Sequence, residues 1–327
     1  MIRKSLATKA LVAASGFALA SATGMAYAQA YPAQPIRMII PSTPGGGTDF
    51  IGRLVSAKLA ELNGWTMLPI NRPGAGTALG LAEGAKANPA GYDLVVGQTD
   101  NVSLIPLLLK VSYDPIKDLT PVALVATTPM VFIVKEDSPY KTLADAISAA
   151  KASPGNISYG TSGTGGTVHI SMELLQLAAG FKMQHVPYKG SAPALADLLG
   201  GHLGFAGSSI SSAASLAHAG KIRALAVTSP KRNQALPDVP AVAEFGYKDY
   251  SVVSYYGVFG PAGMPQQVVA RLNADINKVL QKPEVRTALL GQGLEPNPLS
   301  QDEFAAMIRA DIQKAKDVIR SAGIKVE

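Results

Sequence analysis

The feature that most constrains the fold of this chain is a glycine-rich corner that occurs twice. In "RMIIPSTPGGGTDFIGRLV" (37–55), an apolar run ends in a proline, three glycines follow, and a helical pattern begins. The stretch "NISYGTSGTGGTVHISMELLQLAA" (156–179) has the same order of strand, glycine-rich corner and helix. Consecutive glycines let amide N–H groups point into one small space, and the following helix adds the positive end of its dipole. Two such corners predict two α/β units, each with an anion-type site.

The rest of the chain alternates strand-like and helical patterns, which predicts α/β layers with largely parallel sheets. The apolar run at 119–135 predicts two strands broken near Pro129, and the last part of the chain is predicted to be helical. Helix starts are predicted where Ser or Thr can cap the helix or where Pro fits its first turn. These positions are Thr142, Pro193, Pro265, Pro283 and Ser300.

The N-terminus has the pattern of an export signal. Arg3, Lys4 and Lys9 precede an apolar stretch at 10–20, and A-x-A sites lie at 26–28 and 28–30. We therefore expect a signal peptide over 1–30, cleaved near Ala28 or Ala30, and a periplasmic protein. Without its leader the chain keeps 26 Lys+Arg against 23 Asp+Glu, and no basic stripe is interleaved with aromatics, so no nucleic-acid partner is expected.

Catalytic and metal signatures do not occur in the sequence. The chain has no cysteine, and its four histidines form no H-x-x-x-H pair, so we expect no metal. There is no G-x-S-x-G elbow and no nucleophile beside a base, so we expect no catalytic residue. A P-loop needs Gly-Lys-Ser/Thr at the end of its glycine loop, where this chain has Thr48-Asp49. We also expect no cofactor.

Both corners also have purely structural interpretations. The first corner can be a tight turn in which Thr48 or Asp49 caps the helix. "GAGTALG" (74–80) resembles a dinucleotide fingerprint, but no acid ends the next strand, so a loop facing the first corner is favoured, with Thr77 as a hydroxyl donor. His169 can be a ligand contact or a histidine that packs in the helix and hydrogen-bonds a loop.

Long ordered strings over essentially the whole exported chain resemble the Bug family. They include "YPAQPIRMIIPSTPGGGTD", "NRPGAGT", "SYGTSGTGGTVHISMELL", "HVPYKGSAPALADLLGG" and "PAGMPQQVVARLN". Bug proteins are extracytoplasmic solute-binding components of tripartite tricarboxylate transporters. The resemblance implies an α/β fold of periplasmic-binding-protein type, with two lobes, two crossover connections and a ligand cleft. It implies one lobe at 31–129 and 255–327 and the other at 130–254. A monomer that delivers an organic carboxylate to membrane permease subunits, without catalysis, is the expected function.

The resemblance also implies the ligand-binding residues. They are Ser42, Thr43, Gly45, Gly46, Gly47, Thr48, Asp49, Thr77, Gln98, Thr99, Asp100, Ser162, Gly163, Thr164, Gly165, Gly166, Thr167, His169 and Ser208.

One departure from the family pattern concerns the ligand. Relatives commonly read "DLMFDNLPS" where this chain has "GFAGSSISS" (204–212), so both acids are replaced, by Gly204 and Ser208. Either this is a relaxed hydroxyl-rich loop, or the lost charge predicts a ligand that is anionic at both ends, such as an aliphatic or aromatic dicarboxylate. Alternative functions are a periplasmic sensor that signals to a membrane kinase and, less favoured, a periplasmic hydrolase.

Overall fold

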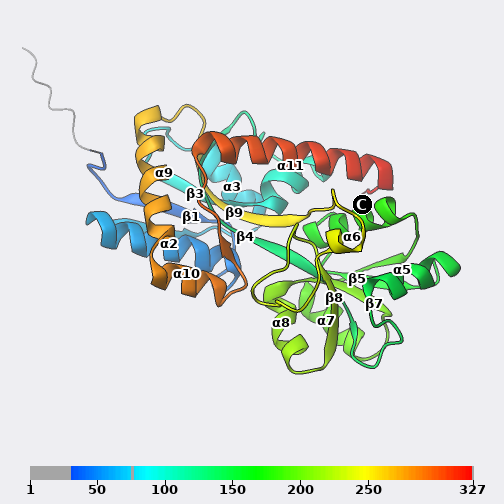
Figure 1. Cartoon of the computed structure of the whole chain (residues 1–327). Coiled ribbons are helices and arrows are strands. Elements are labelled where there is room, and N and C mark those ends of the chain that lie inside the picture. Colours follow the sequence, from blue (N-terminus) through cyan, green and yellow to red (C-terminus); the bar gives the residue numbers. More distant parts are fainter. Residues whose placement is uncertain (1–30, 75–76, 326–327) are drawn as a thin grey trace, which may run out of the picture. The chain divides into compact units, whose positions relative to one another are not determined.

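The long strand β4 (Leu119–Lys135) belongs to both sheets of the protein. The structure is a computed structural model that describes residues 31–74 and 77–325, and the expected signal peptide lies outside the described residues. Residues from Pro35 onward form one compact unit, and everything below concerns that unit. Figure 1 shows β4 at its centre, with one group of elements along each half of the strand.

Sheet A has the order β2-β1-β3-β9-β4, and β10 pairs with the edge of β4 opposite to β9. Strands β1, β2 and β3 are parallel, as predicted, whereas β9 is antiparallel to both β3 and β4. The strands are β1 (Ile36–Ile40), β2 (Met67–Asn71), β3 (Asp93–Gln98), β9 (Val253–Pro261) and β10 (Glu295–Pro296).

Sheet B has the order β4-β7-β5-β6, and β8 pairs with β4 as well. Strand β5 is parallel to β6 and β7, and β4 is antiparallel to β7 and β8. The strands are β5 (Ser158–Thr161), β6 (Gln184–Pro187), β7 (Phe205–Ser209) and β8 (Ile222–Val227). The change of sheet along β4 falls near the predicted lobe boundary, and the division into lobes stays a prediction.

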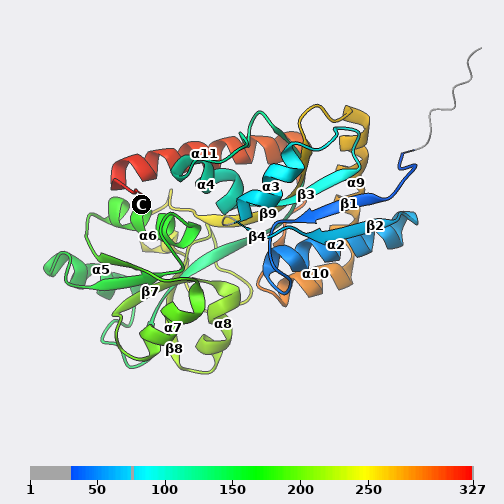
Figure 2. The ribbon, with the colours of Figure 1, turned by 180° about the vertical axis from the view of Figure 1, so that it is seen from behind.

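Helices cover both faces of sheet A. A Cβ added at Gly52 of α2 would meet Ile40 and Val96, and one added at Gly84 of α3 would meet Val95. Since neighbouring strand residues point to opposite faces, α2 and α3 lie on opposite sides of β3, as the two views of Figures 1 and 2 show. The helices that contact sheet A are α2 (Gly47–Asn63), α3 (Ala78–Ala85), α9 (Gln266–Leu280) and α11 (Gln301–Ala322), with α10 (Pro283–Leu290) against β10.

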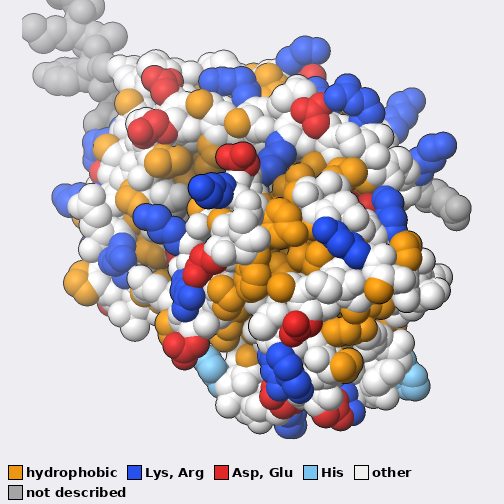
Figure 3. All heavy atoms as spheres, turned by 45° about the vertical axis from the view of Figure 1, so that its right-hand side comes forward, with side chains coloured by type: hydrophobic (Ala, Val, Ile, Leu, Met, Phe, Trp, Pro, Cys, Tyr) orange, Lys and Arg blue, Asp and Glu red, His pale blue; other side chains and the backbone are white. Residues whose placement is uncertain are grey.

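Helix α11 also contacts α6 and the π-helical turn η2 (Asp100–Leu104), which continues into α4 (Ile105–Leu108). Around sheet B the structure has α5 (Leu143–Ala152), α6 (Thr167–Ala179), α7 (Ser191–Leu199) and α8 (Ile210–His218), together with the short helix η3 (Val242–Phe245). On the face drawn in Figure 3, Lys and Arg side chains are interspersed with Asp and Glu side chains.

The predicted helix starts are confirmed. Thr142 and Ser300 each form a capping box, with Asp145 and Glu303 respectively. Pro193 lies in the first turn of α7, Pro265 is the N-cap of α9, and Pro283 is the first residue of α10. These signals are local, so the sequence alone suffices to place them.

Three expectations were wrong. No break occurs near Pro129, because the missing N–H of this proline falls where β4 exchanges partners: Pro129 pairs with Val253 of β9, and the next residue already pairs with β7. The segment 204–212 is not a loop but strand β7 and the start of α8. The last part of the chain, from Pro265 onward, is not entirely helical, since the two-residue strand β10 interrupts it. No element was predicted for the segment that forms β9.

Close packing at Gly257 of β9 gives a test of this architecture. A Cβ there would overlap the ring of Phe304, which is fully buried on α11, and would approach the Ala123 carbonyl oxygen to 3.1 Å. We expect Gly257→Ala to lower the free energy of unfolding by about 1–3 kcal/mol, because the core cannot absorb the added methyl group without strain. Urea denaturation followed by circular dichroism measures this.

The matched control is Gly204→Ala, where the nearest side-chain atom would lie at an ordinary 3.4 Å. We expect a change within about 0.5 kcal/mol there. Equal effects of the two substitutions would contradict the packing of α11 on β9.

Candidate functional site

The first corner joins β1 to α2. Gly45 has φ +93°, a conformation that favours glycine, and the extended Gly46 is the N-cap of the helix. The helix therefore begins at Gly47, directly after these two glycines. Because the first amides of an α-helix have no partner inside the helix, the N–H groups of Gly47 and Thr48 are available at this corner.

The side chain of Asp49 does not cap the helix, and its hydrogen bonds go to the residues of the corner itself and to neighbouring side chains. Its Oδ2 accepts from the Gly45 amide (3.0 Å), and its Oδ1 accepts from Arg53 Nε (2.9 Å) and Asn71 Nδ2 (2.8 Å). Burial alone would raise the pKa of Asp49, but the hydrogen bonds from Asn71, Gly45 and Arg53 outweigh it and lower that pKa. The carboxylate that would repel a ligand anion is thus neutralised by its own neighbours.

The segment after β3 is fixed beside this corner. Gln98 accepts from the hydroxyl of Thr48 (2.7 Å), and Thr99 Oγ1 accepts from the Tyr255 amide (2.8 Å). The fully buried Asn101 accepts from the Gln98 amide (2.8 Å). Asp100 lies between these anchored residues, so its position at the end of β3 is well defined.

The second corner joins β5 to α6. Gly163 and Gly165 have φ +146° and +77°, and Gly166 is the N-cap. His169 supports this corner from behind: its Nδ1 accepts from the Gly165 amide (3.0 Å), which requires the proton to be on Nε2. His169 thus makes the hydrogen bond to a loop that the structural alternative predicted for it.

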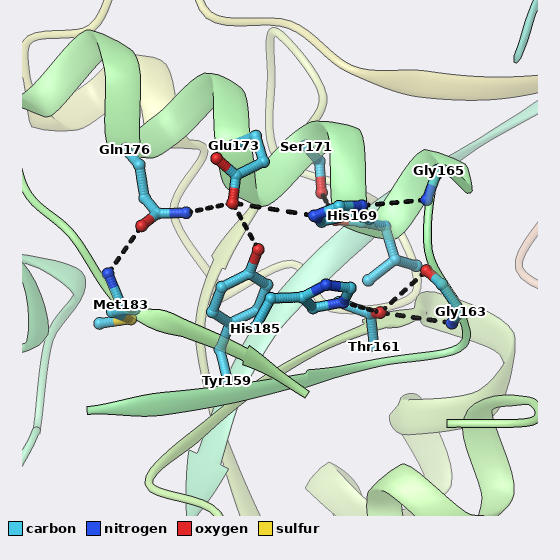
Figure 4. Close-up of polar contacts among 11 residues, drawn as sticks. Tyr159, Thr161, Gly163, Gly165, His169, Ser171, Glu173, Gln176, Met183 and His185 are labelled. Atoms are coloured by element: carbon cyan, nitrogen blue, oxygen red, sulfur yellow. Dashed lines mark hydrogen bonds and ion pairs between the residues drawn. The ribbon is translucent and has the colours of Figure 1, made fainter. Parts of the chain in front are cut away.

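His169 belongs to a buried polar cluster, drawn in Figure 4. Its ring stacks on His185 (centroids 3.8 Å apart), and Glu173 lies 3.8 Å from its Nε2 and accepts from the Tyr159 hydroxyl (2.6 Å). His185 Nε2 lies 2.7 Å from Thr161 Oγ1 at the end of β5. Burial lowers the pKa of both histidines to about 4, so both rings are neutral at pH 7.

The two corners are connected through Asp100. Its Oδ1 accepts from the hydroxyl (2.7 Å) and the amide (3.2 Å) of Thr167, the first residue of α6. A carboxylate is stabilised at such a helix N-terminus by the orphan amides and the helix dipole. The second corner therefore already holds an anion that the protein itself supplies.

A cavity of about 450 Å³ lies between the corners, a volume typical of small-molecule sites. Its lining includes five predicted site residues: Gly45, Gly47, Asp100, Ser162 and Thr167. The remaining lining residues come from β4, β9, α6, α7, the β7–α8 junction and the α10–β10 turn; they are Thr128, Met130, Val168, Ser191, Ser209, Ser211, Ser212, Ser254, Tyr256, Gln292 and Leu294.

The other predicted site residues do not line this cavity. Thr164 and His169 border a larger one of about 580 Å³, next to His185 and the C-terminal end of α11. Gly163, Gly165 and Gly166 border a third, of about 230 Å³. The remaining predicted site residues that do not line the 450 Å³ cavity are Ser42, Thr43, Gly46, Thr48, Asp49, Thr77, Gln98, Thr99 and Ser208. The assignment of all these residues to a binding site stays a prediction.

Three of them, Ser42, Thr77 and Ser208, carry buried hydroxyls that have no hydrogen-bond partner among the described residues. Ser208 is 1 % exposed. Thr77 has φ 80°, a strained value for a residue with a side chain.

Sequence reasoning missed the contribution of β9. Ser254 and Tyr256 are two residues apart and face the cavity together, as do Thr128 and Met130 of β4. The alternation in "VSYYGVF" was the available signal, had this segment been assigned as a strand. Burial, and then the charge of Asp100, raise the pKa of Tyr256 to about 12, so its hydroxyl stays protonated at the cavity wall.

Within the described parts of the chain, no three His, Asp or Glu side chains are grouped so that they could hold a metal ion. None of the described helices combines the length and the apolar character needed to cross a membrane.

Comparison with known proteins agrees with this fold. Residues 51–324 match the model of the "Tripartite tricarboxylate transporter family receptor". A protein encoded in the tcbD-tcbE intergenic region of Pseudomonas sp. (strain P51) is 35 % identical, over 93 % of this chain and 92 % of its own length. A solved periplasmic transporter is 38 % identical, with a TM-score of 0.77 over 91 % of this chain and 100 % of its own. Rpa4515 of R. palustris, solved with adipate, is 33 % identical, with a TM-score of 0.77 over 90 % and 99 %.

The fold is thus that of the periplasmic binding proteins, and a solute-binding protein is the class that fold and cavity define. More narrowly, the chain belongs to the TctC family, the receptors of tripartite tricarboxylate transporters, to which the Bug proteins also belong. This confirms the resemblance seen in the sequence. These receptors are binding proteins and not enzymes.

The role of Asp49 predicts a pH-dependent loss of stability on substitution. We expect Asp49→Asn to lower the free energy of unfolding by about 2 kcal/mol at pH 7, because the charge-assisted hydrogen bonds to this buried side chain are lost. Since folding lowers the pKa of Asp49 below its ordinary 3.8, the difference is fully present above that pH and disappears as the pH falls through the folded-state value. Denaturation at pH 7 and pH 3 measures it.

Asp137→Asn is the control, because this residue is exposed and paired only with Lys135 at the surface. It is expected to change stability by less than about 0.5 kcal/mol at either pH. A pH-independent effect of Asp49→Asn would contradict the loop-closing role.

The hydrogen bond from Gly165 to His169 predicts a difference between two substitutions of similar size. His169→Asn keeps an acceptor close to the position of Nδ1, whereas His169→Leu leaves the buried Gly165 amide without one. We expect the Leu variant to be less stable than the Asn variant by about 1–3 kcal/mol, the cost of a buried unsatisfied donor. Paired denaturation curves test this, and a Leu variant as stable as the Asn variant would contradict it.

Proposed function

We propose that this protein is an extracytoplasmic solute-binding protein that captures a small organic carboxylate in the 450 Å³ cavity and delivers it to a membrane permease. The observation that carries the proposal is that the glycine corner at the start of α2 opens onto this cavity through Gly45 and Gly47. A carboxylate that enters there meets free helix amides and the positive end of the helix dipole.

Neutral donors around the corner can complete the recognition of a carboxylate. Tyr256 lies directly behind Gly47, since a Cβ on that glycine would come within 3.1 Å of its hydroxyl. Ser254, Tyr256 and Ser209 add hydroxyls to the cavity wall. Hydrogen bonds to a charged group each contribute about 1.5–3 kcal/mol, and micromolar affinity corresponds to about 8 kcal/mol. A few such bonds, less the cost of ordering the ligand, reach that affinity without a buried arginine.

The export signal and the family support the transport role. The basic and apolar segments of residues 1–30 have the order of a secretory leader, which would place the protein in the periplasm. A receptor of the tripartite tricarboxylate type works with membrane permease subunits, and a relative with 33 % identity was solved with adipate, a carboxylate.

A thermal-shift screen of the purified protein against mono-, di- and tricarboxylates tests the proposal. A ligand at 100 times its Kd adds about 2.7 kcal/mol of stability, which raises the melting temperature by several degrees. We expect at least one carboxylate class to do this and Tyr256→Phe, which removes one cavity hydroxyl, to weaken the response. Amines and sugars without a carboxylate serve as controls, and a protein that no carboxylate stabilises would rule the proposal out.

A further inference from the structure

The cavity has one charged side chain, and it is negative. Of the described residues that line it, Asp100 alone carries a charge; the others are glycines, hydroxyl residues, Gln292 and apolar side chains. The wall of this cavity contains an acid and no Lys, Arg or His among the described residues, so its two ends must differ in the groups that they offer to a ligand. The first corner supplies N–H donors, and Asp100 supplies an acceptor.

The side chain of Asp100 is held in place by hydrogen bonds. Its Oδ1 is held by both donors of Thr167 at the start of α6, and its backbone neighbours Thr99 and Asn101 are buried and hydrogen-bonded. The amide and hydroxyl of Thr167 at the N-terminus of α6, which would otherwise be open to a second ligand carboxylate, are therefore taken by the carboxylate of the protein. Asp100 lines the cavity, and the hydroxyls around it can either donate or accept.

We infer that the ligand is a monocarboxylate whose other end carries a hydrogen-bond donor, such as an ammonium or amide group, and not a dicarboxylate. This inference rests on the proposed function, since it assumes that the ligand carboxylate binds at the first corner. A second ligand carboxylate at the opposite end of the cavity would lie beside Asp100, where two like charges repel each other. A donor in the same place satisfies the free lone pairs of Asp100 and gains from its charge.

A monocarboxylate with a donor at its other end is not the ligand expected from residues 204–212. The loss of acids at Gly204 and Ser208 suggested a ligand with an anion at each end. In the structure Ser208 is 1 % exposed and is not part of the cavity wall, whereas Asp100 is. The charge that the ligand meets opposite the first corner is therefore negative.

Isothermal titration calorimetry with chain-matched ligands tests this. The series compares hexanoate, adipate and 6-aminohexanoate, and a shorter set compares butyrate, succinate and 4-aminobutyrate. We expect the wild-type protein to bind the amino acid of at least one set tenfold or more tightly than the dicarboxylate of that set, about 1.4 kcal/mol. Asp100→Asn keeps an acceptor for Thr167 but removes the charge, and we expect it to abolish this preference or reverse it. Asp137→Asn, on the surface, should leave the preference unchanged.

The outcomes separate this inference from the proposed function. If dicarboxylates bind the wild-type protein as well as or better than the amino acids, the inference is wrong while carboxylate binding stands. If no carboxylate of either set or of the wider screen binds, both fail. The wild-type series decides the matter alone if Asp100→Asn does not fold.

Discussion

The pairing of β4 with β9 is the constraint on which the rest of the structure depends. These two antiparallel strands run side by side from Leu119 opposite Pro261 to Pro129 opposite Val253. Beyond that point β4 continues without β9 into sheet B, where it pairs with β7 and β8. Every other strand is hydrogen-bonded to this pair directly or through one or two neighbours, so the pair sets where the two glycine corners end up.

The same pair supplies much of the cavity. Thr128 and Met130 of β4 and Ser254 and Tyr256 of β9 line it at the place where the chain leaves sheet A. A strand residue in a regular sheet has its backbone groups satisfied, so only its side chain is available to a ligand. The corners are the reverse case: they have almost no side chains, and their first helix amides are free. The cavity therefore combines side-chain hydroxyls from strands with backbone donors from corners.

Much of this fold could be predicted from the sequence because the signals are local. The capping boxes of Thr142 and Ser300 and the glycine corners depend on residues within one helical turn of each other. Pro129 was misread because its tolerance depends on which strand lies beside it, a property of pairing 124 residues away at Val253. The segment that forms β9 has its partners in β3 and β4, so the alternation in its own sequence could indicate a strand but not its central place in the sheet.

The two glycine corners of the candidate site could be predicted from the sequence, but the groups that hydrogen-bond to them could not. Both corners look alike as strings, with glycines followed by a threonine and a helix. They differ in what the remainder of the protein places against them. At the first, Asp49 bonds back to Gly45 and Arg53, and the amides of the helix remain open to the cavity. At the second, His169 takes the Gly165 amide and Asp100, 67 residues earlier in the chain, takes Thr167. The N-terminus of a helix is stabilised by a nearby carboxylate. When the fold itself supplies that carboxylate, no ligand carboxylate is needed for this stabilisation. Two similar corners thus differ in their chemistry: the first leaves helix amides open to the cavity, and the second holds the carboxylate of Asp100.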